Sequence, residues 1–303
     1  MVNSMISDRT LQQYVTAAMT VDNIGTGSID EPGSAAIKSA VSDLYHELSH
    51  LSNFSSWNWG ISDPETRSSI ASILPDLELI SDGYSEQLYY YVFRRAMEQS
   101  SEANDSLRIL EIGSGSGAGL NFLARIEPGF EYIGVDLTPS AVELANATYS
   151  RREILRYTCG DAEDLPFEDA EFDIVLSIES SHAYPNLEKF ITEVSRVLRI
   201  GGTFGHADVF SESRLRSFRQ LKTPDLFQWA EESDISTIVR ASIAERISSD
   251  SKLRQSLTSA DADKADLMLD LYGRPFLYMD RIPATDSDRL MESSYRVSIA
   301  RRI

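Results

Sequence analysis

The chain has 303 residues, which is long enough for one large domain with an insertion or for two small ones. Its 28 basic and 47 acidic residues give a formal charge of -19, which repels nucleic acid and anionic membranes and favours a neutral or cationic small-molecule partner. The chain has one cysteine, Cys159, no apolar run near the roughly 18 residues that cross a bilayer, and no secretory signal. We therefore expect a soluble, cytoplasmic protein without disulfides.

The first 106 residues have the pattern of a helical region. Within them, His46-Glu47-Leu48-Ser49-His50 fits the zinc-peptidase pattern HExxH, with two histidines one helical turn apart. Only about forty-five residues precede it, too few for the sheet that such peptidases build before their metal helix. We expect a chance match on a helix surface and no metal site.

Short apolar runs alternate with amphipathic stretches from Leu107 to about Val209. The expected strands are Arg108–Ile112, Tyr132–Asp136, Ile154–Cys159, Phe172–Ile178 and Thr203–Val209. The expected helices are Leu120–Ile126, Ala141–Ala147 and Leu187–Leu198, with Pro139 in the first turn of the second and Asn186 capping the third. This alternation predicts an α/β fold in which helices cover both faces of a parallel sheet.

A glycine cluster, Glu111-Ile-Gly113-Ser-Gly115-Ser-Gly117, comes directly after the first strand. A glycine-rich turn between a strand and a helix lets a ligand lie against bare backbone, although this run also fits a loose dinucleotide-binding pattern. Asp136 ends the second strand, where a carboxylate can accept hydrogen bonds from both hydroxyls of a ribose. Both features point to a nucleoside-containing ligand.

Two later segments narrow this interpretation: Gly160-Asp161-Ala162, and Val197-Leu-Arg-Ile-Gly-Gly202. With the glycine cluster and Asp136 they form four motifs in order, and the region from about Leu107 to Asp208 resembles the class I S-adenosylmethionine (SAM)-dependent methyltransferases. The resemblance implies SAM as cofactor, S-adenosylhomocysteine as product and no metal. The residues that it places against the cofactor are Gln87, Glu111, Gly113, Ser114, Gly115, Gly117, Asp136, Leu137, Asp161, Ala162 and Ile178.

The same resemblance implies a Rossmann-like, seven-stranded, mostly parallel sheet. Its last two strands are expected at about Phe227–Ile235 and Ser294–Arg301, the final one antiparallel. The expected regions are an N-terminal helical lid at 1–106, a cofactor-binding core at 107–238, a helical substrate cap at 239–273 and a closing segment with the last strand at 274–303. Residues 274–293 have no predicted place, and the first helix is a candidate for homo-oligomer contacts.

A narrower resemblance concerns the end of the fourth strand and the turn after it. Ser177-Ile-Glu179-Ser-Ser-His182-Ala-Tyr184-Pro185 is similar to a stretch in bacterial methyltransferases that modify lipid polyketides, the phthiotriol dimycocerosate methyltransferases. Because N-terminal helices usually cover the cofactor in this class, some aromatic side chains are candidates for a substrate lid, with plain packing as the alternative. They are Tyr14, Trp57, Trp59 and Tyr184.

His182 and Glu179 are the candidate catalytic residues. Methylation of oxygen needs a base near the acceptor hydroxyl, and a histidine with its ordinary pKa of about 6.5 accepts a proton near neutrality. A supporting role for His182 is the alternative. Families that methylate an alkene carbon carry a glutamate in this neighbourhood, which stabilises the cation that forms.

We therefore expect a small-molecule methyltransferase of secondary metabolism that acts on oxygen. The alternatives are a carbon methyltransferase for a prenyl or terpenoid alkene, with or without cyclisation, and a SAM-binding cyclase or scaffold that has lost methyl transfer.

Overall fold

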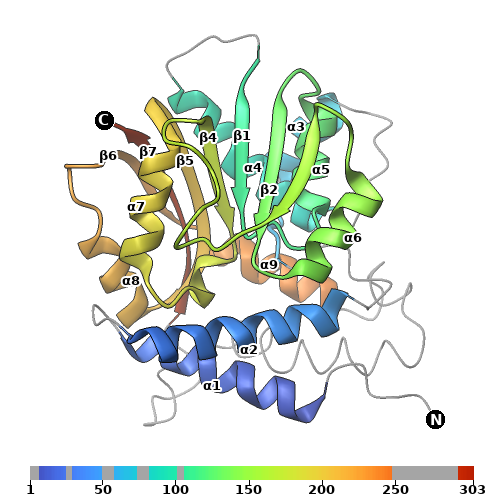
Figure 1. Ribbon diagram of the computed structural model, residues 1–303. Coiled ribbons are helices and arrows are strands. Elements are labelled where there is room, and N and C mark those ends of the chain that lie inside the picture. The colour runs from blue at the N-terminus through green and yellow to red at the C-terminus, as the bar shows by residue number, and fades with distance from the viewer. Residues whose placement is uncertain (1–6, 25–28, 50–57, 74–81, 101–105, 248–292) are drawn as a thin grey trace.

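The computed structural model describes residues 7–24, 29–49, 58–73, 82–100, 106–247 and 293–303 (Figure 1). The helices are α1 (Asp8–Ile24), α2 (Glu31–Ser49), α3 (Pro64–Ile73), α4 (Tyr84–Gln99), α5 (Ala118–Ile126), α6 (Pro139–Tyr149), α7 (Leu187–Val197), α8 (Glu212–Gln220) and α9 (Ser236–Ile247), with a 3₁₀ turn η1 (Ser181–Ala183). The strands are β1 (Arg108–Ile112), β2 (Glu131–Asp136), β3 (Leu155–Cys159), β4 (Phe172–Ile178), β5 (Leu198–Ser211), β6 (Phe227–Asp234) and β7 (Ser293–Arg302).

The strands form one sheet in the order β3-β2-β1-β4-β5-β7-β6. Strands β1 to β5 are mutually parallel, and β7 runs antiparallel to both β5 and β6. This confirms the predicted seven-stranded, mostly parallel sheet with an antiparallel last strand. The strand order reverses between β1 and β4, and ligands of open α/β sheets bind at the carboxyl ends of the strands at such a point.

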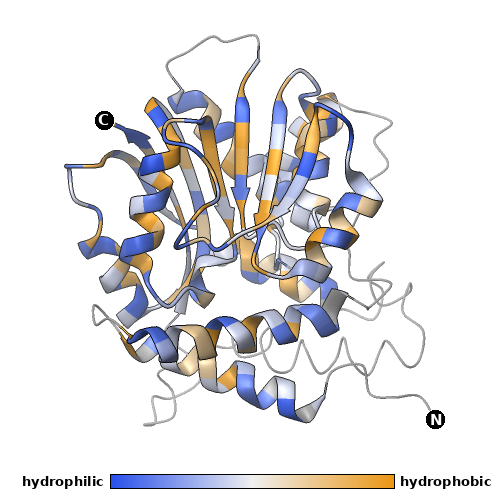
Figure 2. Cartoon of the chain, in the orientation of Figure 1, coloured by the Kyte–Doolittle hydropathy of each residue, from blue (hydrophilic) through white to orange (hydrophobic). Residues whose placement is uncertain are grey.

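Two hydrophobic clusters cover the two faces of the sheet. Ile109 and Ile174 pack with α4, α5 and α9, whereas their neighbours Leu110 and Val175 pack with α7 and α8. The central strands are accordingly hydrophobic along most of their length, as Figure 2 shows. As predicted, the side chain of Asn186 caps α7 by accepting a hydrogen bond from the backbone N–H of Lys189.

The N-terminal region divides into two parts. Helices α1 and α2 lie across the carboxyl edge of the sheet (Figure 1), where α2 contacts α6 and η1. Helix α4 instead packs on the face of the sheet, because its apolar residues, such as Leu88 and Phe93, are buried there. The lid at 1–106 stays a prediction, and of the described helices in that range α1 and α2 are the ones that lie across the carboxyl edge.

The expected cap falls largely outside the described residues. The predicted boundary at 238 lies inside α9, and residues 248–273 of the cap, like the unplaced residues 274–292, are not described. In the ranges that are described, no helix is long and apolar enough to cross a membrane.

Candidate active site

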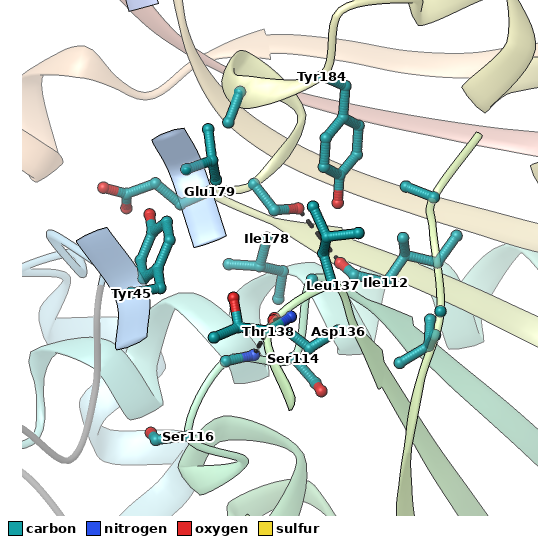
Figure 3. Close-up of a pocket in the computed structure, with 18 of the residues that line it drawn as sticks. Tyr45, Ile112, Ser114, Ser116, Asp136, Leu137, Thr138, Ile178, Glu179 and Tyr184 are labelled. Atoms are coloured by element: carbon teal, nitrogen blue, oxygen red, sulfur yellow. Dashed lines mark hydrogen bonds between the residues drawn. The ribbon is translucent and has the colours of Figure 1, made fainter. Parts of the chain in front are cut away.

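A pocket with about 920 Å³ of empty space, including the solvent space at its mouth, opens at the carboxyl edge of β1, β2 and β4 (Figure 3). Most residues predicted to contact the cofactor line it: Gly113, Ser114, Gly115, Asp136, Leu137, Asp161, Ala162 and Ile178. Glu179 and Tyr184, expected to face the acceptor, line it as well. The pocket thus joins motifs that lie far apart in the sequence.

The glycine turn and Asp136 form one rigid unit. Gly113 has a φ of +75°, and a Cβ added there would lie 2.4 Å from the Cβ of Ser180, so only glycine fits. The carboxylate of Asp136 accepts hydrogen bonds from the backbone N–H of Gly115 at 2.8 Å and of Thr138 at 2.9 Å. Burial raises the pKa of Asp136, and these two N–H groups oppose the rise.

Glu111 is buried next to the glycine turn rather than in the pocket wall. Its Oε1 accepts a hydrogen bond from Tyr89 Oη at 2.5 Å, and its buried Oε2 has no partner among the described residues. Burial, with a contribution from Asp136, raises the pKa of Glu111 to about 8. Tyr89 reaches it because α5 has Gly119 at the contact, where a Cβ would lie 1.9 Å from the tyrosine ring. Because buried polar atoms in native structures nearly always have a hydrogen-bond partner, this oxygen needs one that the described residues do not supply.

The opposite end of the pocket is tied to helix α2 by Lys38. Its Nζ lies 2.7 Å from Asp161 Oδ2 and 2.8 Å from Glu163 Oε2. Asp161 Oδ1 in turn accepts the backbone N–H of Glu163. Lys38 was not predicted as a site residue, because nothing in the sequence links a lysine on α2 to a carboxylate after β3.

Besides Glu111, two predicted cofactor residues lie outside the pocket. The amide of Gln87 accepts from the backbone N–H of Asp63 and donates to the carbonyl of Gly83, so it joins the beginnings of α3 and α4. Gly117 caps α5 with a φ of +82°, and its carbonyl accepts a hydrogen bond from Tyr157 Oη. Both residues shape the frame of the site and do not line it.

Glu179 lines the pocket in a strained backbone conformation. Its φ is +53°, which is unusual for a residue with a side chain and is typical of functional sites. Its Oε2 accepts hydrogen bonds from the backbone N–H of Trp59 at 2.8 Å and from Tyr295 Oη at 3.0 Å. Burial raises the pKa of Glu179 to about 7 despite these donors.

His182 is held by a buried aspartate, Asp208. The Nδ1 of His182 lies 2.8 Å from Asp208 Oδ1, and its backbone N–H donates to Asp208 Oδ2 at 2.9 Å. Burial alone would lower the pKa of His182, but the adjacent carboxylate of Asp208 outweighs it and the net shift is upward. Conversely, His182 and Ser181 hold the pKa of Asp208 at about 2 against the opposing effect of burial. Because Asp208 fixes Nδ1 as the donor, Nε2 is the ring nitrogen left to accept a proton.

Sequence reasoning missed Asp208, although the residue carried a signal. It is a charged residue inside the apolar run Thr203–Val209, and a carboxylate buried there needs partners. The structure supplies His182, Ser181 and the backbone of Val209 as those partners.

The remaining predicted residues lie as follows. Tyr14 of α1 is buried near Asp208 and Glu179, and burial together with these charges raises its pKa to about 12. Trp59 reaches the site through its backbone, whereas Trp57 lies outside the described residues. His46 of the HExxH pattern lies beside Ser140, and the part of the chain that is described has no cluster of metal ligands.

Residues 110–205 match the family model described as a methyltransferase domain. Over these residues the match agrees with the resemblance that the motifs predicted. A 134-residue segment is 37% identical to a probable phthiotriol/phenolphthiotriol dimycocerosates methyltransferase 2 of Mycobacterium ulcerans (strain Agy99), covering 44% of this chain and 51% of that protein. A 125-residue segment is 41% identical to a fatty-acid O-methyltransferase of Mycolicibacterium smegmatis (strain ATCC 700084 / mc(2)155), covering 41% and 43%.

The chain spans about half the length of these curated relatives, or less. The fold extends further. A crystal structure of geranyl diphosphate C-methyltransferase from Streptomyces coelicolor A3(2), in complex with Mg²⁺, geranyl diphosphate and S-adenosylhomocysteine, matches 88% of this chain and 98% of its own with a TM-score of 0.56. The sequence identity of 15% limits this likeness to the fold.

Proposed function

We propose that the chain is a SAM-dependent methyltransferase that methylates a hydroxyl oxygen of a small, lipid-like acceptor. The observation that carries the proposal is a glycine-floored pocket lined by Asp136, with Glu111 buried next to the glycine turn and His182, held by Asp208, next to the lining residue Ala183. The names of the two curated relatives support an acceptor of lipid type. Carbon methylation has weaker support, because it rests on a likeness of fold alone.

The residues of the pocket fit the parts of SAM. Asp136 holds the ribose hydroxyls, Asp161 and Ala162 face the base, and Glu111 receives the amino group at its unsatisfied Oε2. SAM supplies an electrophilic methyl group on a sulfonium. The protein has to hold the acceptor oxygen about 3 Å behind that carbon, on the axis of the bond that breaks.

His182 supplies the base. With SAM bound as the methyl donor, Nε2 of His182 would accept the proton that the acceptor hydroxyl loses. Asp208 stabilises the imidazolium that results. Glu179, whose charge also raises the pKa of His182, strengthens the base while it remains ionised.

Labelled SAM and a panel of long-chain alcohols, phenols and fatty acids test the proposal. We expect transfer of label to a hydroxyl acceptor and binding of S-adenosylhomocysteine in calorimetry. A chain that binds neither SAM nor its product would refute the proposal. A chain that binds both, but transfers no label to any acceptor, would match the cyclase or scaffold alternative.

Asp136→Asn should weaken binding of S-adenosylhomocysteine about tenfold or more, because the charged acceptor of two ligand hydroxyls becomes a neutral amide. Calorimetric titration measures the change. Asp43→Asn, an equal change at an exposed position of α2, is the matched control and should bind as the wild type does. Equal affinities for the two variants would remove Asp136 from the ribose site.

Lys38→Met should speed dissociation of S-adenosylhomocysteine about threefold to tenfold, because it removes the ammonium that joins α2 to Asp161 and Glu163 while keeping the apolar stem. Stopped-flow displacement measures the rate. The control is Lys189→Met, which breaks the exposed ion pair between α7 and Glu31 of α2. If both variants release the ligand at the wild-type rate, Lys38 does not hold the pocket closed.

A further inference from the structure

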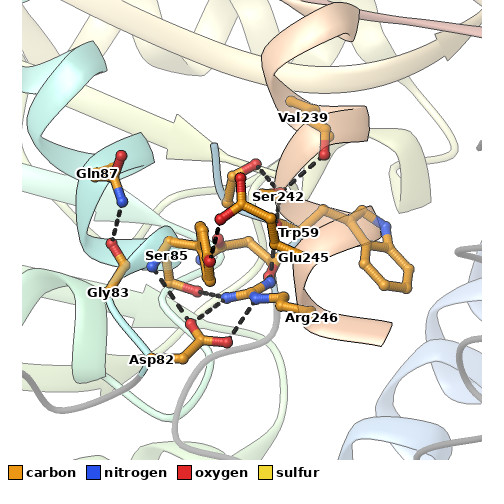
Figure 4. Close-up of polar contacts among 12 residues, drawn as sticks. Trp59, Asp82, Gly83, Ser85, Gln87, Val239, Ser242, Glu245 and Arg246 are labelled. Carbon is orange, nitrogen blue, oxygen red and sulfur yellow. Dashed lines mark hydrogen bonds and ion pairs between the residues drawn. The ribbon is translucent and has the colours of Figure 1, made fainter. Parts of the chain in front are cut away.

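The segment Asn58–Ser62 is fixed by partners along its length (Figure 4). Ser242 Oγ of α9 lies 2.7 Å from the carbonyl oxygen of Trp59 and 3.1 Å from that of Gly60. Ile61 N–H donates to the carbonyl of Tyr84, and Ser62 N–H to that of Ile238. Gly60 has a φ of +64° and lies so close to Tyr84 that a Cβ would come within 2.4 Å of its backbone. The segment therefore has little freedom to move.

Arg246 of α9 is the centre of these contacts. Its Nε and Nη2 donate to the two carboxylate oxygens of Asp82 at 2.7 and 2.8 Å, and Nη2 also donates to Ser85 Oγ at 3.0 Å. Its Nη1 donates to the carbonyls of Asn58 and Trp59 at 2.9 and 2.8 Å. These bonds use all the N–H donors of a guanidinium, and the side chains of both Arg246 and Asp82 are only 9% exposed.

A buried ion pair adds little to the free energy of unfolding compared with apolar packing. We therefore ask which groups the Arg246–Asp82 pair holds in place. Here the fixed group is the backbone N–H of Trp59, which donates to Glu179 Oε2 at 2.8 Å. The carbonyl of the same residue is held by Arg246 and Ser242. The two helices that carry Arg246 and Ser85, α9 and α4, therefore determine where this donor points.

We propose that Arg246, paired with Asp82, is a positioning residue that holds the Trp59 N–H against the Glu179 carboxylate and so keeps that carboxylate ionised and oriented toward the methyl acceptor. The inference rests on the proposed function for its effect on catalysis. Its structural part, the control of Glu179 by a residue on α9, is independent of that function.

When the Trp59 N–H no longer donates, the other groups around Glu179 determine the pKa of its carboxyl. The titratable side chains that act on it, or on which it acts, are Tyr14, Tyr89, His182, Asp208 and Tyr295. Only Tyr295 among them donates a hydrogen bond to its carboxylate in the described residues. Burial and Asp208 both favour the protonated form. Loss of the Trp59 N–H must therefore raise the pKa of Glu179 above about 7.

Arg246→Lys tests the proposal, because lysine keeps the charge for Asp82 but lacks the planar fork that reaches both carbonyls. We expect kcat to fall about tenfold, the acid limb of the kcat profile to move to higher pH, and the affinity for S-adenosylhomocysteine to stay within about twofold. Ser242→Ala, which removes one buried hydroxyl, should shift the profile in the same direction by less. The control is Arg108→Lys, an arginine paired with Glu131 and Glu171 at the start of β1, where the profile should not move.

The titration of Glu179, followed by carbon-13 carboxyl resonances, gives a readout that needs no turnover. A higher pKa of Glu179 in Arg246→Lys and Ser242→Ala supports the positioning role, even if the wild-type chain methylates nothing. An unchanged titration and an unchanged pH profile overturn it. Arg246→Lys could also melt at a lower temperature than the wild type, and the result for Ser242→Ala is then the one that counts. If Glu179 has the wild-type pKa in Ser242→Ala, the proposal is overturned.

Discussion

His182→Ala is expected to lower kcat for methyl transfer by about 10²–10⁴-fold, the usual contribution of a positioned general base. In the proposed mechanism its Nε2 accepts the hydroxyl proton, while Asp208 holds Nδ1. The affinity for S-adenosylhomocysteine should stay within about a factor of two, because His182 does not line the cofactor pocket. Single-turnover kinetics with labelled SAM separate the chemical step from binding.

The pH dependence gives a second test of the same base. The carboxylate of Asp208 raises the pKa of His182, and the base must be neutral to act, so the wild-type rate should rise with pH through a value above about 6.5. Asp208→Asn removes the main cause of that rise, and the acid limb should move to lower pH while kcat falls. His46→Ala, an exposed histidine on α2, serves as the control. Full activity of His182→Ala would show that positioning of the acceptor alone suffices.

The fold could be predicted because the sequence patterns that mark its strands and helices involve neighbouring residues and recur along the chain. Each expected strand of the core is a short apolar run, and each crossover begins or ends at a residue with a physical reason, such as Pro139 in the first turn of α6 or Asn186 as the cap of α7. The glycine turn and Asp136 were also predictable, because backbone clearance and strand-end carboxylates are set by neighbouring residues.

The contacts that complete the site were not predictable, because they join residues far apart in sequence. Lys38 meets Asp161, and Arg246 holds the carbonyl of Trp59; neither pair has a periodicity or a motif that links its members. The amide of Gln87 likewise joins the beginnings of α3 and α4 without a motif that announces it, and its predicted contact with the cofactor stays a prediction. Motifs identify ligand classes, whereas packing decides which polar side chains remain available.

Glu111→Gln should stabilise the ligand-free chain at neutral pH by about 1–3 kcal/mol and at the same time weaken binding of S-adenosylhomocysteine about tenfold or more. The stability effect follows from burial. The pKa of Glu111 is about 8 in the folded chain, well above its ordinary value, so between these values the unfolded chain is ionised and the folded chain is protonated. Folding then takes up a proton, and the stability of the wild type falls as the pH rises through this interval. Glutamine has no such proton, so Glu111→Gln should lose this slope in denaturant unfolding measured from pH 5 to pH 8.

The binding effect has the opposite sign because the ligand changes the environment of the same oxygen. An ammonium group at Oε2 favours the ionised carboxylate, so binding at pH 7 should release close to one proton from Glu111. Calorimetry in two buffers of different ionisation enthalpy measures that release, which should vanish in Glu111→Gln. Glu98→Gln on the exposed face of α4 is the control for both measurements. A Glu111→Gln variant that is less stable than the wild type and binds with equal affinity would mean that this carboxylate supports the packing of Tyr89 and has no part in the ligand site.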